Sequence, residues 1–239
     1  MLSKERLYQL SVLEKTLGYE FSDSYLLNKA LTHKSYTNER DGDMKNNERF
    51  EFLGDAVLDL IVSDYCILTF LDYTEGSLSK IRASVVKESC LAVVASGLNL
   101  GEFLLLGKGE EFSGGRTKSS LLANAFEAVS GAIYRDGGVS SANKILLPLL
   151  KEEINIVAKT SEYRDYKSEL QELTQNKFSC IPNYKVINET GPDHQKTYEV
   201  AVLVKKKLFG SGKGKNKKQA EQAAAQEALL VIQSSNQPK

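Results

Sequence analysis

Two mostly apolar segments that carry carboxylates constrain this chain more than any other feature of its sequence. One runs over residues 47–62 and the other over residues 121–134. Segments that are apolar around most of their circumference form buried helices. The oxygen-bearing side chains that they carry are Glu48, Glu51, Asp55, Asn124 and Glu127. Because a buried carboxylate is costly unless it is paired, hydrogen-bonded or bound to a metal, these acids need partners.

The spacing of these residues predicts that they gather on one side of each helix. Glu48, Glu51 and Asp55 fall at positions i, i+3 and i+7, which share one helical face. Asn124 and Glu127 repeat the i, i+3 spacing on the second helix. If the two helices pack together, their side chains converge. Ligation by oxygen alone suits Mg²⁺ or Mn²⁺ and disfavours zinc.

An alternative partner for these acids is an arginine in the core. Arg49 is one candidate, since it lies in the first segment beside Glu48. A buried ion pair of this kind would have a structural role only. The same arrangement of oxygen donors on both helices favours the metal.

The composition indicates a protein of one or two domains without membrane partners. The 239 residues are 41% hydrophobic, which is enough for a core. No apolar run approaches the roughly 18 residues of a membrane span, and we expect no signal peptide. Cys66, Cys90 and Cys180 have neither disulfide nor zinc spacing, so the sequence predicts a cytoplasmic protein.

The charge is divided unevenly along a chain that is neutral overall. Residues 161–239 hold 13 basic and 9 acidic residues, whereas residues 1–160 hold 18 basic and 22 acidic residues. The two parts therefore carry +4 and −4. A basic part beside an acidic part suggests that the basic part binds nucleic acid.

The apolar pattern changes near residue 160 and predicts a multidomain chain. From about residue 3 to 155 apolar residues recur at helical spacing, which indicates an all-α domain, placed at residues 1–157, of seven to nine helices. Residues 158–164 are polar and are expected to form a linker. A small α+β domain of order α-β-β-β-α is expected at residues 165–234, followed by a disordered tail at 235–239. Its expected elements are a helix at 165–175, strands at 183–187, 196–205 and 208–212, and a helix at 216–233.

The small domain contains a run of lysines that no acidic residue interrupts. Its members are Lys205, Lys206, Lys207, Lys213, Lys215, Lys217 and Lys218. Lys217 and Lys218 open a helix, where cations oppose the helix dipole, so an anion such as phosphate is expected there. The alternative is a solvated lysine-rich loop.

Three stretches together resemble a double-stranded-RNA-binding domain. Residues 165–175 resemble its first helix, residues 191–194 its minor-groove loop, and residues 212–224 its second-helix signature. The resemblance implies that the domain spans two minor grooves and the phosphates between them. The residues that it would place on the RNA are Gln171, Gln175, His194, Lys217 and Lys218. Asn216, where the family often has Ser, should still cap the second helix.

Residues 47–55, Asn-Glu-Arg-Phe-Glu-Phe-Leu-Gly-Asp, closely resemble the signature of ribonuclease III. Residues 30–36, 75–82, 106–110 and 114–116 resemble the family as well. With one RNA-binding domain, this is the simple bacterial architecture. The resemblance implies a homodimer through the endonuclease domain. Each protomer would cleave one strand of double-stranded RNA and leave staggered ends with 5′-phosphate and 3′-hydroxyl groups, in the processing of ribosomal-RNA precursors and structured transcripts.

The resemblance also implies roles for individual residues. Glu51, Asn124 and Glu127 would bind Mg²⁺, with Mn²⁺ as a substitute, and Asp55 and Glu127 would be catalytic. Glu48 would have a structural role linked to RNA binding or to the dimer. Outside these helices, the resemblance adds Arg116 and Lys118 only as candidate RNA contacts.

One position departs from the family pattern. Position 124 is Asn, where the commoner residue is Asp; Asn still offers a carbonyl oxygen but brings one negative charge less. The alternative function is therefore a catalytically weak or inactive double-stranded-RNA-binding protein. A phosphohydrolase of nucleotides is a further rival. It is disfavoured because residues 107–115 form no nucleotide-binding loop, so no nucleotide cofactor is expected.

Overall fold

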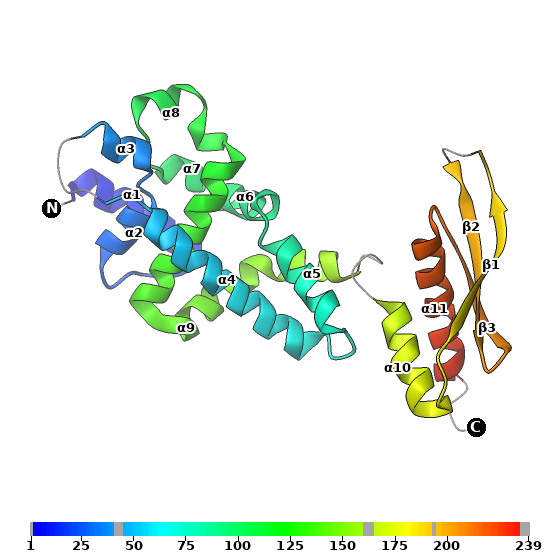
Figure 1. Ribbon diagram of the computed structural model, residues 1–239. Helices are drawn as coiled ribbons and strands as arrows, with labels where there is room; N and C mark the ends of the chain where they lie inside the picture. Colours follow the sequence, from blue (N-terminus) through cyan, green and yellow to red (C-terminus); the bar gives the residue numbers. More distant parts are fainter. Residues whose placement is uncertain (1, 41–44, 160–164, 193–194, 235–239) are drawn as a thin grey trace. The chain divides into compact units, whose positions relative to one another are not determined.

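The computed structural model of the chain describes residues 2–40, 45–159, 165–192 and 195–234 (Figure 1). The chain forms two compact units, a helical unit that ends with α9 and a smaller unit that contains α10, a sheet and α11. The multidomain class expected from the sequence, all-α followed by α+β, is confirmed. No helix in these ranges is long and apolar enough to cross a membrane.

Within the described residues, the larger unit is built of helices, apart from one isolated bridge between Thr32 and Leu105. Its elements are α1 (Lys4–Leu17), α2 (Ser24–Ala30), α3 (Lys34–Asn38), α4 (Glu48–Thr69), α5 (Glu75–Val85), α6 (Glu88–Gly97), α7 (Leu100–Phe103), α8 (Lys108–Phe112), the 3₁₀ helix η1 (Gly115–Thr117) and α9 (Ser119–Lys159). The long helices α4 and α6 pack against α9, which forms the centre of the core. Phe126 and Ile133 of α9 are completely buried there.

Helix α9 is broken once and then continues further than the sequence suggested. Gly138 has φ 72°, a left-handed conformation that glycine adopts without strain, and it interrupts the helix. Beyond the break, the inward residues repeat every four positions and are all buried: Leu146, Leu150, Ile154 and Ala158. This apolar stripe explains why residues 158 and 159, assigned to the expected linker, are helical. The rest of that linker, 160–164, lies outside the described residues.

The smaller unit has the expected order of a helix, three strands and a helix. Its elements are α10 (Tyr166–Phe178), β1 (Asn183–Thr190), β2 (Thr197–Val204), β3 (Lys207–Gly214) and α11 (Lys217–Ser234). The strands form an antiparallel sheet in the order β1-β2-β3, with a register shift between Val186 and Asn188. The expected tail at 235–239 lies outside the described residues.

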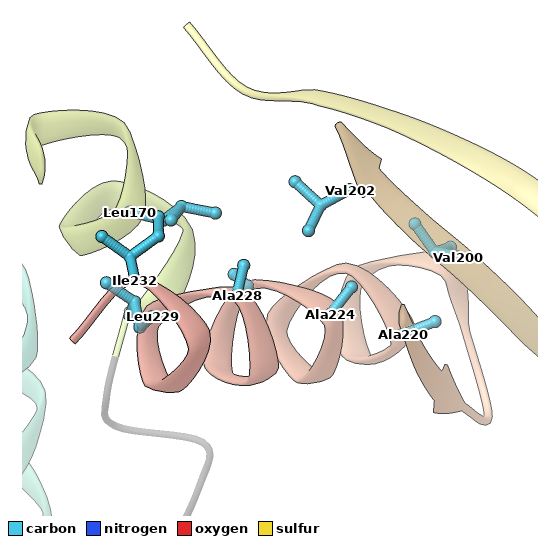
Figure 2. Packing of buried hydrophobic residues seen from close by; sticks show 9 residues of the cluster. Leu170, Val200, Val202, Ala220, Ala224, Ala228, Leu229 and Ile232 are labelled. Carbon is cyan, nitrogen blue, oxygen red and sulfur yellow. The ribbon is translucent and has the colours of Figure 1, made fainter. Parts of the chain in front are cut away.

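Small residues bring α11 close to the sheet. Ala220, Ala224 and Ala228 recur every four residues on α11 and are completely buried, and Figure 2 shows them facing Val200 and Val202 of β2. On β3, a side chain at Gly210 or Gly212 would overlap the backbone of α11 near Ala224. The resulting contact fixes the start of α11 relative to the strands.

Candidate active site

Two glycines place the acidic residues of α4 beside those of α9. A Cβ atom added to Gly54 of α4 would overlap the carbonyl oxygen of Glu127, and one added to Gly131 of α9 would overlap the carbonyl oxygen of Phe50. The two helices therefore touch through their backbones. Glu51 and Asp55 flank Gly54 on α4, so the crossing brings their carboxylates toward Glu127.

The carboxylates of the two helices repel one another. The pKa of Glu127 is raised to about 7 by burial and by the charges of Asp55 and Glu51. The pKa of Glu51 is also raised, by burial and by the charge of Glu48, although Lys34 acts in the opposite direction. Burial and repulsion both disfavour the ionised forms of these two carboxyl groups. A bound cation would stabilise the ionised forms.

No basic side chain in the described ranges forms an ion pair with Glu51, Asp55 or Glu127. Arg49, the candidate from the sequence, is exposed. Glu48 does have a partner, since Lys34 Nζ lies 3.3 Å from its Oε1. The geometry therefore does not support the alternative of core ion pairs, since the pair at Glu48 is exposed.

The oxygen-bearing side chains at the crossing suit a divalent cation chemically, but they do not surround a single point closely. Among the described residues, no group of three His, Cys, Asp or Glu side chains is gathered closely enough to hold a metal ion. The convergence is thus looser than the spacing suggested. Asn124 lies one turn before Glu127, half-buried, and adds a neutral oxygen to an otherwise anionic set. Oxygen donors alone are the ligands that Mg²⁺ prefers.

The repulsion predicts a pH dependence of stability in metal-free protein. The folded-state pKa of Glu127, about 7, lies above its ordinary value of 4.5, so its contribution to stability is fully present below pH 4.5. It is lost as the pH rises from 4.5 through about 7. We expect the free energy of unfolding, measured with urea in EDTA, to fall across this window more steeply than in a Glu127→Gln variant. Parallel curves would contradict this prediction.

The residues expected to contact RNA in the smaller unit are exposed where they are described. Gln171 and Gln175 lie one turn apart on α10, and Lys217 and Lys218 lie in the first turn of α11. A pocket between α10, β1 and α11 has Gln171 and Lys218 in its lining, so two of these side chains border one surface. His194 lies outside the described residues.

The start of α11 is capped as the sequence predicts. The side-chain oxygen of Asn216 accepts a hydrogen bond from the Gln219 N–H at 2.9 Å. This bond satisfies one of the free N–H groups of the first turn. The remaining N–H groups, beside Lys217 and Lys218, form a site suited to an anion.

Arg116 has a structural role in this conformation. Its guanidinium donates hydrogen bonds to the carbonyl oxygens of Gly101 at 2.7 Å and Leu104 at 3.1 Å, and it pairs with Glu111. Lys118 pairs with Glu110 at 3.2 Å. His33 also has a structural role, because its Nδ1 accepts from the Ser35 N–H at the start of α3.

Sequence analysis missed an exposed apolar face on α4. Phe52 is 82% exposed, Leu60 54% and Ile67 61%. They are eight and seven residues apart, which places them on one side of the helix. The general apolar character of the segment suggested burial all round, but the buried residues of α4, such as Gly54 and Ile61, lie on another face of the helix. The spacing of Phe52, Leu60 and Ile67 was the available signal.

Each of the two units of the chain matches a known family. Residues 23–154 match the family described as Ribonuclease-III-like. Residues 166–232 match the double-stranded RNA binding motif. The two matches occur in the order that the sequence motifs suggested.

Relatives of similar length match nearly the whole chain. A protein named Ribonuclease 3 from Nitratiruptor is 46% identical over 96% of this chain and 99% of its own length. Another of that name from Caldanaerobacter subterraneus is 48% identical over 93% of this chain and 98% of its own. The solved nuclease domain of ribonuclease III from Campylobacter jejuni, described as structurally flexible in a region involved in dimer formation, is 48% identical. It covers 59% of this chain and 94% of its own, with a TM-score of 0.55.

Proposed function

Because the chain belongs to the ribonuclease III family of endoribonucleases, we propose that it hydrolyses double-stranded RNA in a Mg²⁺-dependent reaction at the crossing of α4 and α9. The observation that carries this proposal is the group of carboxylates at the crossing. These acids lack ion-pair partners in the described ranges, and burial and mutual repulsion raise the pKa of Glu127 to about 7. Carboxylates with a purely structural role would be paired with basic side chains. Carboxylates that bind a metal ion need no such side chains, because the ion itself balances their charge.

Glu51, Asn124 and Glu127 are the residues that would hold Mg²⁺, or Mn²⁺ in its place. When bound there, the cation would supply Lewis-acid chemistry, activating water and offsetting charge on the phosphate. Asp55, exposed one turn after Glu51, completes the acidic centre and is placed to accept a proton from solvent. The raised pKa of Glu127, about 7, belongs to the metal-free site, and a bound cation would favour the ionised form that serves as a ligand.

The smaller unit would supply the affinity for the duplex. Gln171 and Gln175 on α10 would contact one minor groove, and His194 the next. Lys217 and Lys218 would contact the phosphates of the major groove between them. The exposure of the glutamines and lysines and the capped start of α11 support these roles. The products would be staggered ends with 5′-phosphate and 3′-hydroxyl groups, and the substrates ribosomal-RNA precursors and structured transcripts of the cytoplasm.

The exposed apolar face of α4 supports a homodimer through the endonuclease domain. Phe52, Leu60 and Ile67 form a contiguous helical face of the kind that marks protein interfaces. A second copy of the chain would cover it, as the dimer formation described for the Campylobacter nuclease domain suggests. The dimer would then carry two active sites, one for each strand of the RNA.

A charge on this face should separate the protomers. We expect Leu60→Glu to convert the protein from dimer to monomer in light scattering, because a buried unpaired carboxylate opposes association. Leu230→Glu, on an equally exposed leucine of α11, is the matched control and should leave the dimer intact. A Leu60→Glu protein that remains dimeric at micromolar concentration would place the interface elsewhere.

The function of Asn124 is tested by cleavage of a labelled long RNA duplex with Mg²⁺, with Ca²⁺ and with EDTA. The chain should cut with Mg²⁺ only, and Asn124→Asp should cut faster at limiting Mg²⁺, by about tenfold, because a carboxylate adds a charge to the metal site. At saturating Mg²⁺ the two rates should approach one another.

Other outcomes separate the two candidate functions. Cutting by the Asn124→Asp protein alone would show that this chain is a binding protein with a disabled site, the alternative that Asn124 favours. Tight binding without cutting by either protein would refute the nuclease. Cleavage in EDTA would refute the proposed dependence on a divalent metal ion.

A further inference from the structure

The hairpin between β2 and β3 carries three exposed lysines that the proposed function does not use. Lys205 and Lys206 form a two-residue turn, and Lys207 begins β3 opposite Val204. In the described parts of the chain, none of the three forms an ion pair with an acidic residue. We call these three residues the hairpin lysines.

The backbone of this turn is strained by its residues. Lys205 has φ 48° and Lys206 has φ 65°. Two-residue turns with both φ values positive strongly prefer Asn-Gly, because other side chains crowd the backbone in the left-handed region. Unfavourable backbone conformations of this kind tend to persist at functional sites. Lysine is thus unfavourable for the backbone at both positions, which indicates that the charges serve another purpose.

The turn is held in place by the end of α10. The rings of Phe178 and Phe209 lie 6.1 Å apart, and Lys205 Nζ lies 6.0 Å from the centre of the Phe178 ring. Phe209 is the residue that the register shift leaves unpaired on β3. The charges therefore sit on a supported turn, and Lys177 in the last turn of α10 adds a fourth exposed cation next to Phe178.

The hairpin lysines lie at the opposite end of the sheet from the expected phosphate contacts. Tyr198 at the start of β2 pairs with Gly214 at the end of β3, just before Lys217 and Lys218, whereas Val204 pairs with Lys207. Each strand has eight residues. At about 3.3 Å per residue, the two basic sites are separated by roughly 25 Å along the sheet.

We propose that the hairpin lysines bind the phosphate backbone of a second RNA segment, so that the protein favours substrates in which another duplex arm adjoins the one gripped by α10 and α11. This rests on the proposed duplex binding by those helices. A polyanion is the partner that matches three adjacent exposed cations, and these cations lie a sheet length away from the basic start of α11. The substrate class is therefore folded RNA with neighbouring helices.

The test compares two RNAs and three forms of the full chain, in EDTA to prevent cleavage. One RNA is a duplex of about 16 base pairs, the span of one domain, and the other joins a second such arm to it. The hairpin variant combines Lys205→Asn, Lys206→Gly and Lys207→Gln, which relieves the strain and removes the charges. The matched control combines Lys4→Gln, Lys15→Gln and Lys144→Gln, which removes three exposed charges from the helical unit.

We expect the hairpin variant to bind the simple duplex as the unmodified chain does and to bind the two-arm RNA about tenfold more weakly. Its salt slope on the two-arm RNA should fall by about 2 to 3. The control should bind both RNAs normally. Equal loss of binding on both RNAs, or no loss on either, would overturn the inference. So would a hairpin variant that loses binding only to polyglutamate, because that result would indicate an acidic protein partner. Absence of duplex binding by every form would overturn the proposed function as well. Cleavage of the simple duplex, measured separately with Mg²⁺ in place of EDTA, distinguishes failure of the inference from failure of the proposed function. Only the proposed function predicts that the hairpin variant cleaves this duplex.

Discussion

Replacing Gly54 with alanine should cost about 3 kcal/mol or more of folding stability and abolish cleavage. The new methyl group would overlap the carbonyl oxygen of Glu127, and backbone cannot move aside as a flexible side chain can. The two helices must separate, which disrupts the main contact of the core and moves Glu51 and Asp55 away from Glu127. Thermal unfolding should occur about 6 to 12 °C lower.

Gly97→Ala provides the matched control for this prediction. Gly97 is the last residue of α6, and nothing lies within 4 Å of a Cβ atom added there. The substitution should leave cleavage unchanged and stabilise the helix slightly, since alanine restricts the unfolded chain. A Gly54→Ala protein with normal stability and activity would show that the two helices are not in backbone contact.

Replacing Glu127 with glutamine should lower the rate of cleavage about a thousandfold, equivalent to about 4 kcal/mol of transition-state stabilisation. Glutamine keeps the size of the side chain but removes the negative charge of a proposed metal ligand. The fold should be retained or stabilised, because the substitution removes the repulsion from Asp55 and Glu51. Binding of duplex RNA in Ca²⁺ should remain normal, since the basic residues of the smaller unit are untouched.

The same substitution at Glu152 separates a site effect from a general effect of charge. Glu152 is exposed on the far half of α9, and Glu152→Gln should cleave at the normal rate. If Glu127→Gln also cleaves within tenfold of the normal rate, Glu127 is not a ligand of the catalytic metal. Loss of binding together with cleavage would instead indicate a misfolded chain.

The fold was accessible from the sequence wherever apolar periodicity was strong. The alternation of Val200, Val202 and Val204 predicted β2, and all three are buried. The prediction was weakest where polar residues continue an element. β1 extends to Thr190, three residues past its expected end, because pairing with β2 through Thr197 satisfies the backbone of a polar, exposed strand.

The site could be predicted in part. Helical spacing placed Glu51, Asp55 and Glu127 on two apolar helices, and the structure brings these helices together. The spacing could not tell how closely the carboxylates approach, since that depends on the crossing. Nor could it distinguish the buried face of α4 from the exposed one at Phe52, because burial depends on which neighbours the fold provides. The assignment of metal and RNA ligands remains a prediction from resemblance.

The glycine crossing of α4 and α9 also bears on how the enzyme responds to heat. Where helices meet through side chains, rotamer changes loosen the contact gradually on warming. Here the spacing is set by main-chain atoms of Gly54, Gly131 and their neighbours, which have no rotamers to populate. The spacing of the two helix backbones that carry the carboxylates should therefore stay constant until the domain unfolds. An Arrhenius plot of cleavage should be straight up to that temperature and then break sharply.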